Sequence, residues 1–217
     1  MINILISIVV AYLLGSIPTA VWVGKWMYHL DIREHGSRNA GATNTLRVLG
    51  PKAGIPVMIF DVLKGWLAVK AAGWLGGEAV SGDGRELFLI GAGVAAVLGH
   101  VFPVFAGFRG GKGVATLLGM GIALFPWPAL GVVVVFTTMM LIFRIVSLSS
   151  ITAGITFPLM VLLLPYEPRP GLPLIVLSFL VAIFLPLTHK SNIRRLLKGE
   201  EKKFTIASRP PQNQKMQ

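Results

Sequence analysis

Residues 2–24 read INILISIVVAYLLGSIPTAVWVG, an almost unbroken apolar run that is long enough to cross a lipid bilayer. A spanning helix needs about 20 predominantly apolar residues. The run starts at Ile2 without a basic segment before it and has no small-residue cleavage signature, so we expect a retained span rather than a signal peptide. Four further apolar runs are of similar character, at 53–75, 86–106, 129–143 and 172–188, and two more are short, at 114–125 and 150–164.

The composition supports the same fold class. Hydrophobic residues make up 54% of the 217 residues and charged residues only 13%, which is too little polar surface for a soluble domain. We therefore predict an all-α integral membrane protein. The net charge of +11 does not indicate a nucleic-acid partner, because the charges lie between and after the apolar runs. The absence of Cys excludes disulfides, thiolate nucleophiles and Cys-based metal sites.

The distribution of Lys and Arg predicts the topology. If every run crosses and the N-terminus lies outside, the cytoplasmic segments hold sixteen of the twenty Lys and Arg residues. This asymmetry follows the positive-inside rule and predicts seven transmembrane helices with a cytoplasmic C-terminus. The two short runs would rise only about 18–22 Å, against a hydrocarbon core of roughly 30 Å. Five spans with a re-entrant hairpin are therefore the alternative.

The chain reads as one domain, because no linker or repeat separates the runs. We expect a single seven-helix membrane domain over residues 1–201. Residues 202–217 are polar and rich in Pro and Gln, so we expect a disordered tail.

Four polar segments collect on the predicted cytoplasmic face: 36–47, 107–116, 144–150 and 189–195. The first reads GSRNAGATNTLR and offers backbone N–H groups, hydroxyls, amides and two Arg, which are groups that bind phosphate. It could instead be a loop with topology anchors, although anchors need charge rather than interleaved Asn, Thr and Ser. Its candidate phosphate-binding residues are Ser37, Asn39, Thr43, Asn44 and Arg47.

The second segment contains Gly110, Gly111, Lys112 and Gly113 at the start of a predicted helix. It is not a Walker A motif, because the glycine spacing differs and a glycine follows the lysine. Glycines nevertheless let backbone N–H groups approach an anion, while Lys112 and the helix N-terminus add positive charge. The alternative is a flexible turn with a lysine that snorkels to the interface.

The remaining candidates are isolated polar residues next to apolar runs. His189 and Asn192 are three apart and would share a helix face, in a functional or a structural role. His100 is expected to be a buried histidine that orients a loop. Asp61 and Lys64 lie inside the second apolar run, where charges are usually paired or functional. A structural pair is favoured over a catalytic link. Ser150, or Ser147 in its place, is a weaker phosphate candidate.

Several chemistries are excluded by absent patterns. The chain has no His-x4-Asp dyad and no Gly-x-Ser-x-Gly motif. Clusters of His and acidic residues with metal-ligand spacing are also absent, so neither a metal nor a cofactor is expected. Acidic residues are scarce on the predicted inner side, which makes a carboxylate base unexpected; they are Asp31, Glu34, Glu200 and Glu201. Such a site suits substrates that bring their own anionic and leaving groups.

The motifs together resemble those of the bacterial membrane acyltransferases that move a fatty acyl chain from acyl-phosphate to glycerol-3-phosphate. The resemblance covers nearly the whole chain. Arg38 stands where this family often has Gly, and Arg109 where Lys is common. The matching segments are Gly15-Ser16-Ile17-Pro18-Thr19, residues 36–47, Asp61-Val62-Leu63-Lys64-Gly65, Gly99-His100 with Pro103, residues 110–116, and His189-x-x-Asn192-Ile193-x-Arg195 with Gly199-Glu200.

The resemblance implies that the products are 1-acylglycerol-3-phosphate (lysophosphatidic acid) and phosphate, and that neither acyl-CoA nor acyl carrier protein is the donor. It also implies seven spans in the bacterial inner membrane with the active site facing the cytoplasm. The expected partners are the two substrates and the lipid bilayer. The residues expected to act in catalysis are Arg47, Lys112, His189 and Asn192.

Two other classes of function remain alternatives. An organic-phosphate transporter would suit the positive loops, but transporters usually show inverted repeats and polar residues near the midplane. No repeat is visible in this chain, and its polar segments lie on one predicted face. A membrane scaffold would not need the Gly-Gly-Lys-Gly loop.

Overall fold

The computed structural model describes residues 1–164 and 169–205. Within these residues the fold is entirely helical, which confirms the predicted all-α class. The α-helices are α1 (Ile2–Gly15), α2 (Thr19–Tyr28), α3 (Ala42–Leu49), α4 (Pro51–Gly76), α5 (Asp83–Val101), α6 (Val114–Leu124), α7 (Pro126–Phe143), α8 (Val146–Leu163), α9 (Leu172–Thr188) and α10 (Lys190–Leu197). Short 3-10 helices are η1 (Ile32–Glu34), η2 (Gly77–Ala79) and η3 (Val104–Ala106). Most of the predicted tail, residues 206–217, lies outside the described residues.

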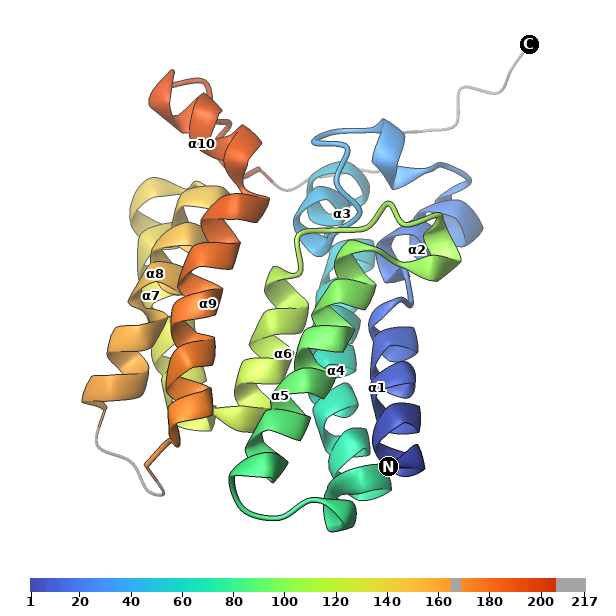
Figure 1. Cartoon of the computed structure of the whole chain (residues 1–217). Helices are drawn as coiled ribbons and strands as arrows, with labels where there is room; N and C mark the ends of the chain where they lie inside the picture. The colour runs from blue at the N-terminus through green and yellow to red at the C-terminus, as the bar shows by residue number, and fades with distance from the viewer. Residues whose placement is uncertain (165–168, 206–217) are drawn as a thin grey trace.

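Each predicted apolar run corresponds to one main helix, and these seven helices, α1 and α4 to α9, lie side by side (Figure 1). The short helices α2, α3 and α10 gather at one end of the bundle, and the N-terminus lies at the other end. Two runs are bent. The first bends by 41° between α1 and α2, where Pro18 cannot continue the helix, and α9 and α10 meet at 65°.

Length and composition identify fewer spans than the seven expected. Among the described residues, the helical segments Gly84–Ala106, Pro126–Phe143 and Val146–Leu163 are long and apolar enough to cross a membrane. The number rises to five if each bent pair is one span. The run at 150–164 is longer than predicted because its helix begins at Val146, whereas α6 remains short with 11 residues.

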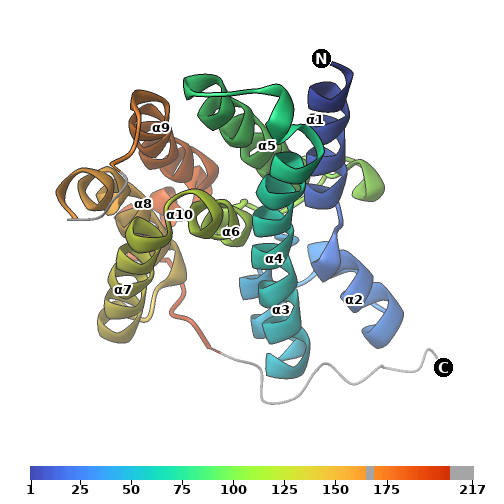
Figure 2. The same cartoon turned by 90° about the horizontal axis from the view of Figure 1, so that it is seen from below.

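The helices form two groups, which Figure 2 shows from below. Helices α1, α4, α5 and α6 pack together, α7, α8 and α9 form the second group, and α6 and α5 connect the two. Glycines allow the close approach within the first group. A methyl group at Gly119 of α6 would lie 1.9 Å from the Val62 carbonyl oxygen, and one at Gly15 would lie 2.0 Å from that of Ala96. Small residues at helix contacts are typical of membrane bundles.

A small core fixes the polar end of the bundle. Ile32 of η1, Leu49 of α3 and Val57 of α4 are each at most 2% exposed and belong to one apolar cluster. Arg33 donates to the Ala106 carbonyl over 2.8 Å and pairs with Asp31 over 2.7 Å. The guanidinium holds the pKa of Asp31 well below its usual range. The loop before α3 is therefore tied to α4 and to η3, and its position next to the α6 N-terminus is set.

Candidate functional site

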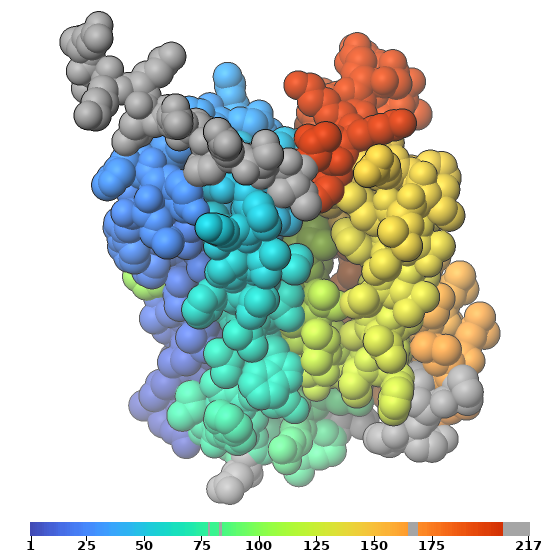
Figure 3. All heavy atoms as spheres, turned by 180° about the vertical axis from the view of Figure 1, so that it is seen from behind, coloured from blue at the N-terminus to red at the C-terminus, as the bar shows by residue number. Residues whose placement is uncertain are grey.

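A cavity of about 1000 Å³ lies between the two helix groups, with walls from α3, α4 and α6 on one side and α7, α8 and α9 on the other. Figure 3 shows it from behind as a hollow between α4, in cyan, and the yellow helices α7 and α8. One end is polar and lies beside α3 and α10, and the rest is apolar. The charged and histidine residues that line it are Arg38, Arg47, Asp61, His100, Lys112, His189, Arg195, Glu201 and Lys202.

Arg47 lies at the polar end of the cavity. It lies in the last turn of α3, is half-buried, and lines the cavity. Among the described residues it forms no hydrogen bond or ion pair. Ser37, Asn39 and Thr43 also line the cavity. Arg47 is positioned by α3, and its charge has no partner among the described residues. Such a cation is suited to binding an anion.

Asn44 forms hydrogen bonds with the backbone of its own loop. Its expected contact with the substrate stays a prediction. Its side chain is 1% exposed, and its amide nitrogen donates to three backbone carbonyls, those of Ile32, His35 and Asn39, each over 3.0 Å. Its oxygen accepts the Ser37 N–H over 2.8 Å. The amide therefore shapes the whole 32–44 loop and places Ser37 at the cavity.

The glycine loop before α6 differs from a phosphate loop in how it uses its N–H groups. The N–H groups of Gly110 and Gly111 donate to the carbonyls of Val101 and His100, each over 3.1 Å. Side chains have no room there, because a methyl at Gly110 would lie 2.0 Å from the His100 carbonyl oxygen. Neither glycine lines the cavity, so they brace the loop. Gly113, with a φ of +80°, is the N-cap of α6 and lines the cavity beside Lys112.

Lys112 belongs to a polar network that the sequence did not reveal. Its Nζ donates to Asn192 Oδ1, and Asn192 Nδ2 donates to Glu201 over 2.6 Å. The Glu201 carboxylate also accepts from Ser147 over 2.7 Å and from Arg195 over 2.6 Å. Because each atom of the Asn192 amide has its own partner, its oxygen is held toward Lys112. We call these five residues the lysine network.

Burial shapes the charge of this network. Burial, together with the nearby charges of Arg195 and Arg47, lowers the pKa of Lys112 to about 8 against the opposing effect of Glu201. Burial alone would raise the pKa of Glu201, but the hydrogen bonds from Asn192, Ser147 and Arg195 keep it below its ordinary value. Glu201 is therefore ionised, and its oxygens accept hydrogen bonds from three side chains. The scarcity of acids on the inner side made a carboxylate base unexpected, and Glu201 lies within the site as a hydrogen-bond acceptor.

His189 and Ser150 complete the polar end. His189 is 3% exposed and lies between α9 and α10, where its Nδ1 is 2.8 Å from the Leu185 carbonyl oxygen. Because a carbonyl only accepts, Nδ1 carries the proton, and Nε2 remains as the acceptor of the neutral ring. Ser150 is 3% exposed and lines the cavity one helical turn after Ser147.

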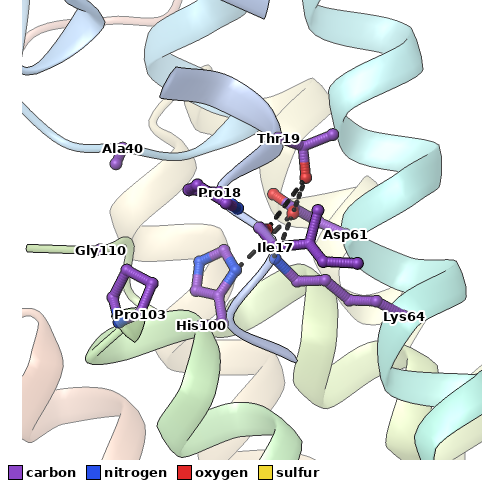
Figure 4. A pocket seen from close by; sticks show the side chains of 9 residues that line it. All are labelled: Ile17, Pro18, Thr19, Ala40, Asp61, Lys64, His100, Pro103 and Gly110. Carbon is purple, nitrogen blue, oxygen red and sulfur yellow. Dashed lines mark hydrogen bonds and ion pairs between the residues drawn. The ribbon is translucent and has the colours of Figure 1, made fainter. Parts of the chain in front are cut away.

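A second polar cluster lies next to the cavity (Figure 4), and it confirms the expected pairing of Asp61 and Lys64. The two charges are 2.8 Å apart, and both side chains are at most 7% exposed. Thr19 donates to Asp61 over 2.9 Å, Lys64 donates to the Ile17 carbonyl over 2.9 Å, and His100 Nδ1 lies 3.7 Å from Asp61. They enclose a space of about 10 Å³, about enough for one water. We call these residues the aspartate cluster.

The site thus combines an anion-binding end with an apolar chamber. Five cations line the cavity, and the carboxylates that line it, Asp61 and Glu201, both have partners within the described chain. The described residues contain no group of three or more His and acidic residues that could hold a metal ion. The arrangement can hold phosphate groups at the polar end and an aliphatic chain in the rest of the cavity.

Comparisons with known proteins agree with this chemistry. The family model for "Glycerol-3-phosphate acyltransferase" matches residues 5–199. Curated proteins of that name from Enterococcus faecalis and Chlorobaculum tepidum are 41% and 42% identical, each over 95% of this chain and over 94% and 98% of their own lengths.

The solved structures agree as well. The crystal structure of PlsY, described as an integral membrane glycerol 3-phosphate acyltransferase in its glycerol 3-phosphate form, superposes with a TM-score of 0.81. Its identity to this chain is 38%, over 93% of this chain and 96% of PlsY. The lysophosphatidic acid form gives a TM-score of 0.78.

Proposed function

The chain belongs to the glycerol-3-phosphate acyltransferase family, and on this premise we propose that it transfers a fatty acyl group from acyl-phosphate to the 1-hydroxyl of glycerol-3-phosphate. The products are lysophosphatidic acid and inorganic phosphate. The observation that carries this proposal is the single cavity with a cationic end and an apolar remainder. An acyl-phosphate has the same two parts, and the acceptor adds a second phosphate at the polar end.

The proposed setting is the bacterial cytoplasmic membrane, crossed seven times with the N-terminus outside and the site facing the cytoplasm. This setting is supported by α3 and α10 lying at the end of the bundle opposite the N-terminus (Figure 1). It is also supported by the cations of residues 25–52, 109–112 and 190–203, which the positive-inside rule assigns to the cytoplasm.

In the proposed reaction the acceptor hydroxyl oxygen attacks the acyl carbonyl carbon, and the bond from this carbon to the phosphate oxygen breaks. Phosphate leaves with the electron pair, and the hydroxyl proton passes to a phosphate oxygen of a substrate. Arg47 and Lys112 hold the phosphates and offset the charge that grows on the leaving group. Little activation is needed because the donor is a mixed anhydride, so positioning supplies much of the rate.

The other polar residues position the acceptor. Asn192, His189 Nε2 and Ser150 would contact the hydroxyls or phosphate of glycerol-3-phosphate, with Ser37 and Thr43 on the opposite wall of the cavity. Glu201 acts through Asn192 rather than as a base, because its oxygens already accept three hydrogen bonds. The sequence alone had left Glu201 out of this set.

The transporter alternative fits the cavity less well. A transporter moves a polar substrate past the membrane midplane and needs polar contacts there. Here the cations lie at one end of the cavity, and apolar side chains such as Phe125, Ala129 and Leu177 line the other.

A direct assay tests the proposed reaction. Purified protein in detergent is given hexadecanoyl-phosphate and glycerol-3-phosphate, and both phosphate release and lysophosphatidic acid are measured. We expect one phosphate for each lysophosphatidic acid, no release without the acceptor, and no product when hexadecanoyl-CoA replaces the donor. Equal product from the CoA ester, or no acceptor-dependent phosphate release, would contradict the proposal.

A further inference from the structure

Two aromatic rings line the lower end of the apolar part of the cavity. Phe125, at the α6–α7 junction, is 1% exposed, and Phe157 of α8 is 8% exposed. Their rings meet edge to face with centroids 5.4 Å apart, and both line the cavity. In Figure 3 the yellow-green atoms of the α6–α7 region fill the space below the hollow. We call these two residues the phenylalanine floor.

The local sequence fixes the height of this floor. Phe125 precedes Pro126, and the residue before a proline is pushed out of the helical conformation. Phe125 accordingly has a φ of −137° and a ψ of 65°, and Pro126 starts α7. The Phe125 N–H donates to the Gly121 carbonyl over 2.6 Å, and its carbonyl accepts the Ala129 N–H over 2.8 Å. The residue is therefore anchored to both helices and cannot slide along the cavity.

The depth of the cavity matches one leaflet of a membrane. Helix α6 runs from the loop that carries Lys112 down to the floor, and its 11 residues rise about 16 Å. Half of a hydrocarbon core of roughly 30 Å is about 15 Å. Residues that line the cavity near the floor include the small side chains of Ala129 and Ala153. The short α6, which is a poor membrane span, has the length of a single acyl chain.

We propose that Phe125 and Phe157 set the longest acyl chain that the enzyme transfers efficiently. This inference rests on the proposed function, because the acyl group must lie in the cavity while its phosphate is held at the cationic end. A chain that ends at the rings fits without rearrangement. A longer chain must bend or withdraw its carbonyl from the acceptor, and each unaccommodated methylene in an apolar pocket reduces the relative rate by about tenfold or more.

An internal competition measures this limit. Purified enzyme receives glycerol-3-phosphate with an equimolar mixture of hexadecanoyl- and eicosanoyl-phosphate, and the two products are quantified by mass spectrometry. We expect the unaltered enzyme to favour the shorter chain, and Phe125→Ala and Phe157→Ala to raise the eicosanoyl-to-hexadecanoyl ratio by about tenfold. The ratio does not depend on how much of a variant is folded, so partial unfolding does not obscure the result.

Two further variants complete the design. Ala129→Leu fills the space above the floor and should favour dodecanoyl- over hexadecanoyl-phosphate in the same type of mixture. Phe88→Ala removes an equal ring from the α1–α4–α5 core, away from the cavity, and should leave every ratio unchanged. Unchanged ratios in both floor variants, or an equal shift in Phe88→Ala, would overturn the inference. No product from any acyl-phosphate with the unaltered enzyme would instead overturn the proposed function.

Discussion

The aspartate cluster and the lysine network are two buried polar groups at the same end of the bundle, and they differ in how their charges are balanced. Asp61 has Lys64, Thr19 and His100 around it, and the space they enclose holds about one water. The lysine network includes two cations and one carboxylate and opens into a large cavity, which is also lined by Arg47, a cation with no partner among the residues that the structure describes. We therefore expect the first group to stabilise the fold by joining helices, and the second to bind an anionic ligand.

The largest expected effect is on stability, from breaking the aspartate cluster. Asp61→Asn leaves the Lys64 charge buried without its partner, and such a loss costs about 3–5 kcal/mol. We expect a clear fall in Tm in detergent, while the activity of each remaining folded molecule stays near that of the unaltered enzyme. If Asp61→Asn kept its Tm and lost turnover, Asp61 would have the catalytic link that the sequence left open.

Loss of the central cation should affect turnover instead. Lys112→Ala removes a charge from the proposed phosphate-binding end of the cavity, and the loss of one such contact costs about 10²–10³ in rate. We expect this fall in kcat/KM without a lower Tm. Lys190→Ala, which removes an exposed lysine outside the cavity, is the matched control and should remain active. Near-normal turnover of folded Lys112→Ala would remove Lys112 from the site.

A smaller effect is expected from the carboxylate that orients Asn192. Glu201→Gln keeps the shape of the side chain but weakens charge-assisted hydrogen bonds, which should lower kcat/KM about tenfold. The neighbouring Glu200 is exposed, so Glu200→Gln serves as the control. Equal activities of the two variants would show that Glu201 does not position the site.

The smallest effect is the pH dependence of Lys112. Its pKa of about 8 means that the charge is present below this pH and is lost above it. Because kcat/KM reports the free enzyme, it should fall up to about tenfold between pH 7 and pH 9. In Lys112→Arg the charge persists, so the alkaline fall should move to higher pH. An unchanged profile in that variant would assign the fall to another group.

The same contrast explains what the sequence could predict. The apolar runs located α1 and α4 to α9, including the short α6, because burial in a membrane needs a continuous apolar stretch. The Asp61–Lys64 pair was predictable because three residues separate partners on one helix face. The hydrogen bonds of Gly110 and Gly111 were not predictable, because their N–H groups donate to carbonyls at the end of α5, which no local spacing indicates.

Glu201 was missed for a related reason, since its partners come from α8 and α10 and no local spacing connects them. The one available signal was Gly199. Its φ of +69° lets the chain turn back after α10, as glycine often does after a helix. The turn directs Glu201 toward the site, but only the fold shows which residues it reaches.

Thermal unfolding with and without glycerol-3-phosphate tests the contrast most directly, because a ligand raises Tm only when the folded protein binds it. We expect the ligand to raise the Tm of the unaltered protein. Lys112→Ala should start from the same Tm and show little or no rise, whereas Asp61→Asn should start lower and show the full rise. An undiminished rise in Lys112→Ala, or its loss in Asp61→Asn alone, would contradict the division between a binding cluster and a structural one.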